Sequence, residues 1–317
     1  MAAYNGEMYI TEQIDSIINQ SYENWELIIR DDDSTDTTVP IIEKYTLLDP
    51  RISILRDNLG NNGQCANFDS LMKYAIEKYS GSTDVYYMFA DQDDYWKKDK
   101  LQVSLEAMLS IEDNFDKKEP ILVYSNYEVS KTTLDNPSLV YTNDLNYSDK
   151  EIASRLLVQN WVMGCTIIIN RELLLLSAGI PAVADNHDNW IAVLCSLVGH
   201  LGYVSQPTMI HRLHFDNVTA NVNTKKLRFR IVRVLSRFKN NKELFKKRYH
   251  LYLEVEKRLS GLLNPEMQNL FLEYKKVLQK PGLGSVITAA KNKFFSVNRL
   301  QTILFFGQLL SPRDKII

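Results

Sequence analysis

The sequence is short of the features that mark secreted, zinc-binding and membrane-spanning proteins. Its 317 residues include three cysteines, Cys65, Cys165 and Cys195, which lie far apart and form no CxxC pair. This spacing indicates a reducing compartment and argues against a structural zinc site. No apolar run approaches the ~20 residues that a membrane-spanning helix needs. The patterns GxxxxGKS/T and GxGxxG are also missing, so we expect no glycine-rich loop that binds phosphate groups.

Positive charge is scarce in most of the chain and concentrated near its end. Residues 1–224 contain 16 Lys and Arg against 33 Asp and Glu, whereas residues 225–317 contain 21 against 6. Such asymmetry between two parts of a chain predicts an anionic surface as partner for the basic part. It also predicts two domains, 1–224 and 225–317.

Strand-like and helix-like segments alternate over the first two-thirds of the chain. The predicted strands are Trp25–Asp31, Ile52–Arg56, Val85–Ala90, Ile121–Val129 and Cys165–Asn170. The predicted helices between and after them are 7–20, 36–48, 65–79, 99–112 and 188–198. This order predicts an α/β fold with a Rossmann-like, mainly parallel sheet flanked by helices. From about residue 225 onward the pattern is only helical, which predicts an α-helical C-terminal domain.

The first predicted strand is short. Tyr4-Asn5-Gly6 predicts a turn into the first helix, and only Met1-Ala2-Ala3 precede it. A doubly wound sheet would have a strand of ~5–6 residues at this point. We therefore expect a truncated first strand, through a misassigned start or a truncated gene.

A cluster of carboxylates follows the predicted strand Val85–Ala90. The apolar run ends at Asp91-Gln92-Asp93-Asp94. Ligands bind at the carboxyl ends of strands in open α/β sheets, and carboxylates gathered there repel one another unless a cation lies among them. Oxygen ligands suit Mg²⁺ or Mn²⁺ held jointly with a substrate's phosphates. The segment therefore predicts a metal–diphosphate site.

A second acidic segment follows the predicted strand Trp25–Asp31. It is Asp31-Asp32-Asp33-Ser34-Thr35-Asp36. Carboxylates at this end of a strand can accept hydrogen bonds from the N–H of a base or from ribose hydroxyls. Alternatively, Ser34 or Asp36 caps the next helix. The second acidic strand end at residues 91–94 favours the site.

Together these segments resemble family 2 glycosyltransferases. The similarity covers about residues 1–220, in order and in spacing, and it rests on Ala3-Tyr4-Asn5-Gly6, Asn19-Gln20-Ser21-Tyr22, Trp25-Glu26-Leu27 and the two acidic segments. The resemblance implies an inverting enzyme of the GT-A fold that uses a nucleotide-diphosphate sugar. Within the family, the chain is most similar to bacterial rhamnosyltransferases that build cell-wall or surface polysaccharide.

The resemblance implies roles for residues of the donor pocket. Tyr4 and Asp32 would line the pocket for the base and ribose, to which Ala3 contributes backbone. The loop 58–63 and Asn67 would lie beside the donor.

The acidic segments carry two further implications. Asp93 would bind the metal, and Asp91 would lie toward ribose or sugar. Asp33 stands where the family usually has Gly or Asn. If that position needs a positive φ, Asp tolerates it less well than Gly, and nucleotide affinity would suffer.

The segment Asn186-His187-Asp188-Asn189-Trp190 resembles the family's HDWW-like segment, in which the carboxylate is the catalytic base. An inverting transfer needs one base to take the acceptor's hydroxyl proton, and the resemblance assigns this role to Asp188. A helix cap is the alternative role. Asn189 replaces an aromatic residue common in the family, which leaves the acceptor contacts open.

A fourth segment, His211-Arg212-Leu213-His214-Phe215-Asp216-Asn217, resembles the family's R-x-H-x-x-N. His214 would be a metal or diphosphate ligand, or else a structural histidine, and Arg212 would offset phosphate charge. Gly164-Cys165 resembles the family's GC segment near the donor sugar, which implies a small buried cysteine and not a nucleophile.

The basic C-terminal part predicts an interaction with a membrane surface. Residues 225–258 hold thirteen Lys and Arg against three Glu, interleaved with apolar residues, and this suits an anionic membrane surface. We expect no nucleic acid as partner, because the acidic part would repel it. The alternative is a helical appendage with a solvated basic face. The stretch Val286–Leu310, with Phe294-Phe295 and Phe305-Phe306, would be core, membrane contact or partner surface.

We therefore predict a metal-dependent inverting glycosyltransferase, cytoplasmic and peripheral at the inner face of the cell membrane. The predicted donor is dTDP-L-rhamnose and the acceptor a growing lipid-linked glycan. Alternatives are a UDP-hexose or UDP-N-acetylhexosamine donor and a catalytically weak scaffold subunit of polysaccharide assembly. A phosphohydrolase is disfavoured, because the acidic cluster has no His ligands near it in the sequence.

Overall fold

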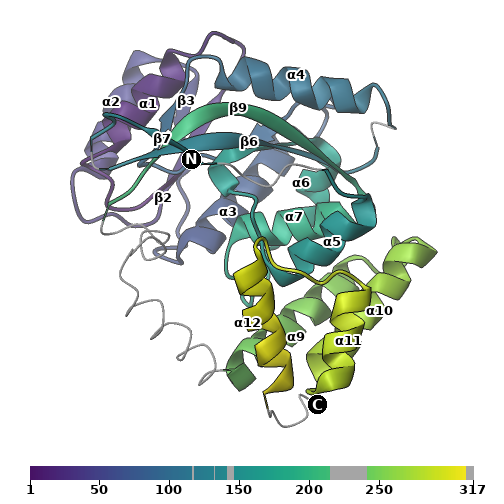
Figure 1. The fold of residues 1–317 in the computed structure, drawn as a ribbon. Coiled ribbons are helices and arrows are strands. Elements are labelled where there is room, and N and C mark those ends of the chain that lie inside the picture. Colours follow the sequence, from purple (N-terminus) through teal and green to yellow (C-terminus); the bar gives the residue numbers. More distant parts are fainter. Residues whose placement is uncertain (116–117, 132, 141–145, 215–240, 312–317) are drawn as a thin grey trace. The chain divides into compact units, whose positions relative to one another are not determined.

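The computed structural model describes residues 1–317 except 116–117, 132, 141–145, 215–240 and 312–317 (Figure 1). The chain forms two compact units. The first consists of Met1–Asp144, Val162–Ile191 and His200–His214, and the second of Leu145–Trp161, Ala192–Gly199 and Phe215–Ile317. The domain boundary predicted at residue 224 lies outside the described residues and stays a prediction.

The first part of the chain forms a parallel three-stranded sheet. Its order is β1-β2-β3, with β1 at Ala2–Ala3, β2 at Leu27–Asp31 and β3 at Ile52–Ile54. The helices of this region are α1 (Ile10–Ile18), α2 (Thr38–Leu48) and α3 (Gln64–Lys78). In α1 the buried residues Ile10, Ile14 and Ile17 recur at helical spacing and form the face that enters the core. Strands that alternate with helices confirm the predicted α/β class.

A second sheet has six strands and mixed pairing. Its order is β4-β8-β6-β9-β5, and β7 pairs with β6. Only β6 and β9 pair in parallel, and the other pairs are antiparallel. The bounds are Tyr87–Met88 for β4, Tyr95–Trp96 for β5, Ile121–Ser130 for β6, Ser138–Val140 for β7, Ile167–Ile169 for β8 and His200–Arg212 for β9. The sheet was predicted to be mainly parallel, and in the structure this holds for β1–β3 and for β6 with β9, whereas the other pairs are antiparallel.

Strand β9 was not predicted from the sequence, although it is the longest strand described. Gly202 and Pro207 interrupt its apolar pattern, and both residues usually weaken a strand assignment. In the structure, Pro207 pairs with Asn126 where the register between β6 and β9 shifts. A proline is tolerated at such an irregularity because the ladder is already broken there.

Three helices accompany the second sheet. They are α4 (Lys100–Glu112), α6 (Arg171–Ser177) and α7 (His187–Val198). Helix α4 packs on β6, β8 and β9, and its Met108 is fully buried against Val123 and Ile168. An isolated parallel bridge between Ala2 and Asp91 links the two sheets.

In the second unit, all regular secondary structure among the described residues 241–310 is helical. Its helices are α5 (Asp149–Val158), α9 (Asn241–Arg258), α10 (Pro265–Gln279), α11 (Leu283–Lys291) and α12 (Arg299–Leu310). Helix α10 begins with Pro265, and the Asn264 side chain accepts a hydrogen bond from the Met267 N–H. The helical prediction is therefore confirmed for this range, whereas residues 225–240 lie outside the described residues.

The aromatic residues of the predicted amphipathic stretch divide between core and surface. Phe294 and Phe305 are buried, and Phe305 stacks on Phe245 with ring centroids 6.4 Å apart. Phe295 and Phe306 are half-buried. None of the described helices is long and apolar enough to cross a membrane.

Candidate functional site

The acidic turn after β4 lies against the end of β9. His214 Nε2 is 2.7 Å from Asp93 Oδ2, and the Arg212 Nε–H donates a hydrogen bond of 3.1 Å to the Asp93 carbonyl. These residues are about 120 positions apart in the sequence, and the pairing of β5 with β9 brings their segments together. The structure thus places the predicted residues Asp91, Asp93, Arg212 and His214 at one edge of the sheet.

The carboxylates of this turn raise one another's pKa, because their negative charges repel. Burial, and then the charges of Asp94 and Asp93, raise the pKa of Asp91 to about 8. Burial and the charge of Asp94 also raise the pKa of Asp93. A divalent cation among these groups would relieve the repulsion, and carboxylate oxygens suit Mn²⁺ or Mg²⁺. By their chemistry, the carboxylates of this turn therefore fit the metal that the resemblance implies.

The last residue of the acidic turn, Asp94, belongs to a buried group of three side chains. Asp94, Cys165 and His211 each offer an atom within 4.8 Å of the other two, and all three side chains are buried. Burial raises the pKa of the Cys165 thiol. A thiol that stays protonated is a poor nucleophile and a poor metal ligand, in agreement with the small buried residue predicted at this position.

Asp32 organises the loop that precedes α3. Its carboxylate accepts hydrogen bonds from Arg30 Nη1 at 2.7 Å, from the Gly63 N–H at 2.8 Å and from the Asn62 N–H at 3.1 Å. Arg30 also bonds Asp57 through Nε at 2.8 Å. Because protein donors already occupy the lone pairs of Asp32, a base N–H could reach this carboxylate only by displacing one of the loop amides.

Asn67 lies at the first turns of α3, against the backbone of β1 and β2. Its side-chain amide donates to the Arg30 carbonyl at 3.2 Å and is 3.4 Å from the Ala3 carbonyl. Ala3 accepts a hydrogen bond of 2.8 Å from the Asp32 N–H. These contacts place Asn67, Ala3 and Asp32 side by side, and all three residues are buried. Their roles at the donor stay predictions.

Tyr4 and the turn after it contact both acidic segments. The Tyr4 N–H donates to Gln92 Oε1 at 2.8 Å, and Gln92 Nε2 donates to the Tyr4 carbonyl at 2.7 Å. The Asn5 N–H donates to Ser34 Oγ at 2.8 Å. A Cβ at Gly6 would lie 2.2 Å from Gln92 Oε1, so only glycine allows this approach. The Tyr4 side chain itself is 46% exposed, which leaves its ring available to a ligand.

Asp188 lies in the first turn of α7, one residue after the helix begins. Its Oδ2 accepts a hydrogen bond of 3.1 Å from the Gly164 N–H, which opens the short 3-10 helix Gly164–Thr166. Its Oδ1 accepts from the Asn189 N–H at 2.5 Å. The carboxylate thus accepts hydrogen bonds from two backbone amides, of which Gly164 lies outside α7. Asp188 is inside the helix and does not occupy the position of an N-terminal cap.

His187, next to Asp188, is held in an aromatic pocket. Its ring centroid is 4.0 Å from that of Phe68 and 5.2 Å from that of Phe89. A Cβ at Gly164 would lie 2.4 Å from His187 Nε2, so this histidine and Gly164 pack closely. Burial lowers the pKa of His187 to about 3. His187 therefore stays neutral at pH 7.

Three residues of this region were missed by the sequence analysis. Arg30 and Asp57 form an ion pair that supports Asp32, and Gln92 links the Tyr4 turn to the acidic turn. Arg30 is a charged residue inside the apolar strand of residues 25–31, and this was the signal that could have identified it. A buried arginine needs carboxylate partners, so the sequence could have predicted an ion pair there. Gln92 and Asp57 had no comparable signal.

Comparison with known proteins identifies relatives among bacterial enzymes. Residues 1–119 match the family model Glycosyl transferase family 2. The dTDP-rhamnosyl transferase RfbG from Shigella flexneri is 30% identical over 71% of this chain and 75% of its own length. The UDP-Glc:alpha-D-GlcNAc-diphosphoundecaprenol beta-1,3-glucosyltransferase WfgD from Escherichia coli is 28% identical over 61% of this chain and 68% of its own length.

Another relative is TuaG from Bacillus subtilis, assigned to teichuronic acid biosynthesis, which is 33% identical over 54% of this chain. The chain spans 60% of the length of TuaG.

Two solved structures share the fold. Staphylococcus aureus TarS 1–349 in complex with UDP-GlcNAc matches with a TM-score of 0.55 and 15% identity, over 87% of this chain and 70% of that chain. The mannosyltransferase PcManGT from Pyrobaculum calidifontis, in complex with GDP-Man and Mn²⁺, matches with a TM-score of 0.51 and 14% identity, over 92% of this chain and 72% of that chain. Since RfbG reaches 30% identity over three quarters of its length, the sequence relationship goes beyond a shared fold. The chain belongs to glycosyl transferase family 2.

Proposed function

We propose that the chain is an inverting, metal-dependent glycosyltransferase of the GT-A type. It takes a sugar from a nucleoside diphosphate donor and transfers it to a growing, lipid-linked surface polysaccharide. The observation that carries this proposal is the convergence of Asp93 with His214, 2.7 Å apart, beside the turns that hold Tyr4 and Asp32. A cation site and a nucleotide pocket at one sheet edge suit a nucleoside diphosphate.

The donor end of the reaction depends on charge. Asp93 and His214 would hold Mg²⁺ or Mn²⁺, and Asp91 would face ribose or sugar. When bound, the metal would offset the negative charge of the leaving diphosphate. Arg212, whose side chain bonds the Asp93 carbonyl and the carboxylate of Glu12, would add positive charge beside the phosphates.

The acceptor end of the reaction depends on a base. Asp188 would accept the proton of the acceptor hydroxyl as that oxygen attacks the anomeric carbon. The bond from this carbon to the diphosphate oxygen breaks on the opposite face, and the nucleoside diphosphate leaves. The Gly164 N–H, 3.1 Å from Asp188 Oδ2, would keep the carboxylate oriented.

We propose dTDP-L-rhamnose as the donor, supported by the similarity to RfbG. UDP-glucose and UDP-N-acetylglucosamine are the alternatives, supported by WfgD and TarS. A panel of nucleotide sugars, each with and without Mn²⁺ or Mg²⁺ and scored by nucleoside diphosphate release, tests the proposal. Nucleoside diphosphate release from dTDP-rhamnose alone supports this donor. Release from a UDP-sugar alone would identify that UDP-sugar as the donor instead. No release from any donor with metal and acceptor extract contradicts the enzymatic function and favours the scaffold alternative.

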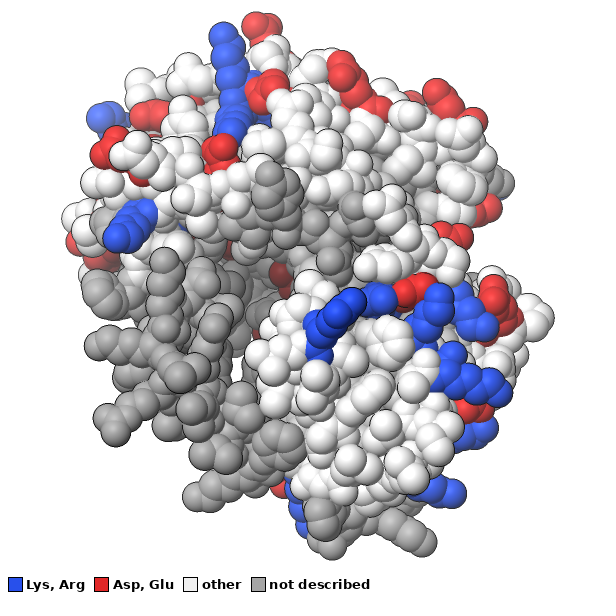
Figure 2. Space-filling view, in the orientation of Figure 1, with Lys and Arg blue, Asp and Glu red and all other residues white. Residues whose placement is uncertain are grey.

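The basic C-terminal part would bring the enzyme to its acceptor. Figure 2 shows Lys and Arg side chains gathered on the surface of the C-terminal helices. Such a surface suits the anionic inner face of a cell membrane, where a lipid-linked acceptor would lie. In sedimentation with anionic vesicles at low salt, we expect the protein to pellet, and to stay in solution with neutral vesicles. Equal recovery in the supernatant with both would contradict membrane association.

A further inference from the structure

The ring of Tyr9 contacts both side chains at the end of β9 that bond the acidic turn. Its centroid is 4.8 Å from that of the His214 ring, and the two planes are inclined by 32°. The central carbon of the Arg212 guanidinium is 4.7 Å from the same Tyr9 centroid. Tyr9 directly precedes α1, so a residue from the first part of the chain packs on both of these side chains.

Both of the contacted side chains hold Asp93. His214 Nε2 lies 2.7 Å from Asp93 Oδ2, and the Arg212 Nε–H donates to the Asp93 carbonyl at 3.1 Å. The first contact orients the carboxylate, and the second holds the backbone that carries it. A carboxylate with a fixed orientation loses less conformational freedom when it binds a cation, and the partners of metal ligands typically contribute about 10–100-fold to metal affinity.

The Arg212 side chain depends on such contacts because it is buried. It is 3% exposed, and its Nη2 bonds the carboxylate of Glu12 in the first turn of α1. A guanidinium that is shielded from water is attracted to the face of an aromatic ring more strongly than an exposed one. Tyr9 and Glu12 have the i, i+3 spacing of neighbours on a helix surface, so one side of the start of α1 holds this arginine.

The backbone of Tyr9 is itself held in place. Its N–H donates to the Gly6 carbonyl at 3.0 Å, and its carbonyl accepts from the Gln13 N–H at 3.2 Å. The Gly6 N–H donates in turn to Thr38 Oγ1, the first residue of α2, at 2.7 Å. Because Gly6 lies in the same turn as Tyr4, Tyr9 connects the predicted nucleotide side of the site with the acidic turn.

We propose that Tyr9 is a positioning residue for the metal site of the proposed function. Its ring fixes the side chains of His214 and Arg212, and these two orient Asp93. The role presupposes that metal site, because Asp93 is the ligand that it orients. Both contacts involve the ring, so the aromatic ring, and not the hydroxyl, is required. A ring that only helped the chain to fold would lower the melting temperature when removed and leave the Mn²⁺ affinity of the folded protein unchanged.

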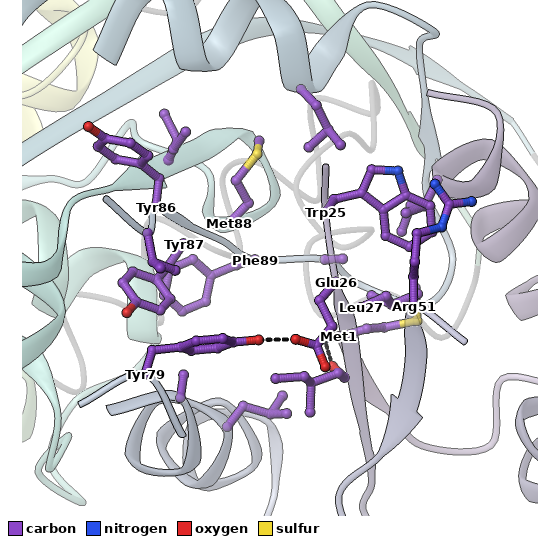
Figure 3. Close-up of a pocket in the computed structure, with 18 of the residues that line it drawn as sticks. Met1, Trp25, Glu26, Leu27, Arg51, Tyr79, Tyr86, Tyr87, Met88 and Phe89 are labelled. Atoms are coloured by element: carbon purple, nitrogen blue, oxygen red, sulfur yellow. Dashed lines mark hydrogen bonds between the residues drawn. The ribbon is translucent and has the colours of Figure 1, made fainter. Parts of the chain in front are cut away.

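The test compares substitutions of Tyr9 in the full chain. Tyr9→Phe keeps the ring, whereas Tyr9→Leu and Tyr9→Met both remove it, so that one folded variant of the two suffices. Tyr79→Leu is the matched control. Figure 3 shows Tyr79 at the wall of an apolar cavity of about 580 Å³, where its hydroxyl donates to the Glu26 carboxylate. Tyr9, His214 and Arg212 do not line this cavity, so the control removes a tyrosine ring from the same unit without touching the acidic turn.

Titration of Mn²⁺ followed by electron paramagnetic resonance gives the first readout. Mn²⁺ should bind about tenfold more weakly to Tyr9→Leu and Tyr9→Met than to the original chain. Tyr9→Phe and Tyr79→Leu should bind Mn²⁺ as the original chain does. All affinities are measured below the melting transition of the least stable variant. Equal affinities of the original chain and Tyr9→Leu, or equal losses in Tyr9→Leu and Tyr9→Phe, would overturn the proposal.

The imidazole NMR resonances of His214 give a second readout, which needs no metal. The chain has five histidines, and the signal that is missing from His214→Gln identifies the one of interest. Because the Tyr9 ring shifts this resonance, Tyr9→Leu and Tyr9→Met should move it and Tyr9→Phe should not. An unmoved resonance in folded Tyr9→Leu would overturn the positioning role. Failure of the original chain to bind Mn²⁺ would contradict the metal site itself, and a moved resonance would then still support Tyr9 as the residue that positions His214.

Discussion

His211 Nδ1 lies 2.7 Å from Asp94 Oδ1, and both side chains are buried. Burial opposes a charge on His211, but Asp94 and then the other carboxylates raise the pKa of this histidine to about 9. The charged pair ties the end of β9 to the acidic turn after β4. Through it, the conformation of Asp93 depends on residues more than a hundred positions away.

The first prediction concerns this pair. Asp94→Asn removes the charge that holds His211 while keeping the size of the side chain. Because groups that orient metal ligands typically contribute 10–100-fold to metal affinity, we expect Mn²⁺ to bind about tenfold more weakly. Titration of Mn²⁺ followed by electron paramagnetic resonance measures this. Asp113→Asn, which changes an exposed carboxylate after α4, is the control, and equal affinities in the two variants would contradict the prediction.

The second prediction concerns the proposed base. Asp188→Asn should lower the transfer rate at least about a hundredfold, since a positioned base contributes 10²–10⁴-fold. Donor binding, measured by calorimetry, should persist, because the role of Asp188 lies at the acceptor. Asp185→Asn changes an exposed carboxylate three residues earlier and should leave transfer unchanged. If Asp188→Asn abolishes donor binding in a folded protein, the role of Asp188 lies at the donor instead.

The third prediction concerns backbone strain at Asp33, whose φ is +70°. The sequence analysis considered a positive φ at this position, and the structure has one. Glycine adopts this conformation without the steric cost that Asp incurs, so Asp33→Gly should stabilise the fold by about 1 kcal/mol. Thermal melting should show an increase of about 2–4 °C. Asp113→Gly, at a φ of −63°, should show no increase, and a rise of the same size there would remove strain as the explanation.

The fourth prediction concerns pH and His187. Its pKa is about 3 in the folded chain and about 6.5 when unfolded, so the unfolded state binds one more proton between these values. Stability is therefore complete above about pH 6.5 and falls as the pH decreases toward 3, by up to about 1.4 kcal/mol per pH unit.

In His187→Leu this contribution to the pH dependence disappears. Denaturant unfolding at pH 6.5, 5.5 and 4.5 should give a shallower loss of stability for the variant than for the original chain. The exposed His250, changed to Gln, serves as control and should keep the steep loss. Parallel curves for the original chain and His187→Leu would mean that His187 is accessible to protons when folded.

Much of the first sheet was predictable because its signals are local. The run of residues 25–31 is apolar and β-branched, and it ends in carboxylates, so both the strand and the polar edge follow from neighbouring residues. The same holds for the acidic turn after residues 85–90. Strand β9 escaped prediction because Gly202 and Pro207 break its pattern, and only pairing with β6 compensates for them.

Local patterns in the sequence specify which segments end in carboxylates and where helices begin, because these effects act within a few residues. The partners of those carboxylates depend on the folded chain. Asp93 meets His214 and Asp94 meets His211 only because β9 pairs with β5 across more than a hundred residues. Sheet order, and not sequence order, determines which strand ends lie side by side and therefore which side chains meet.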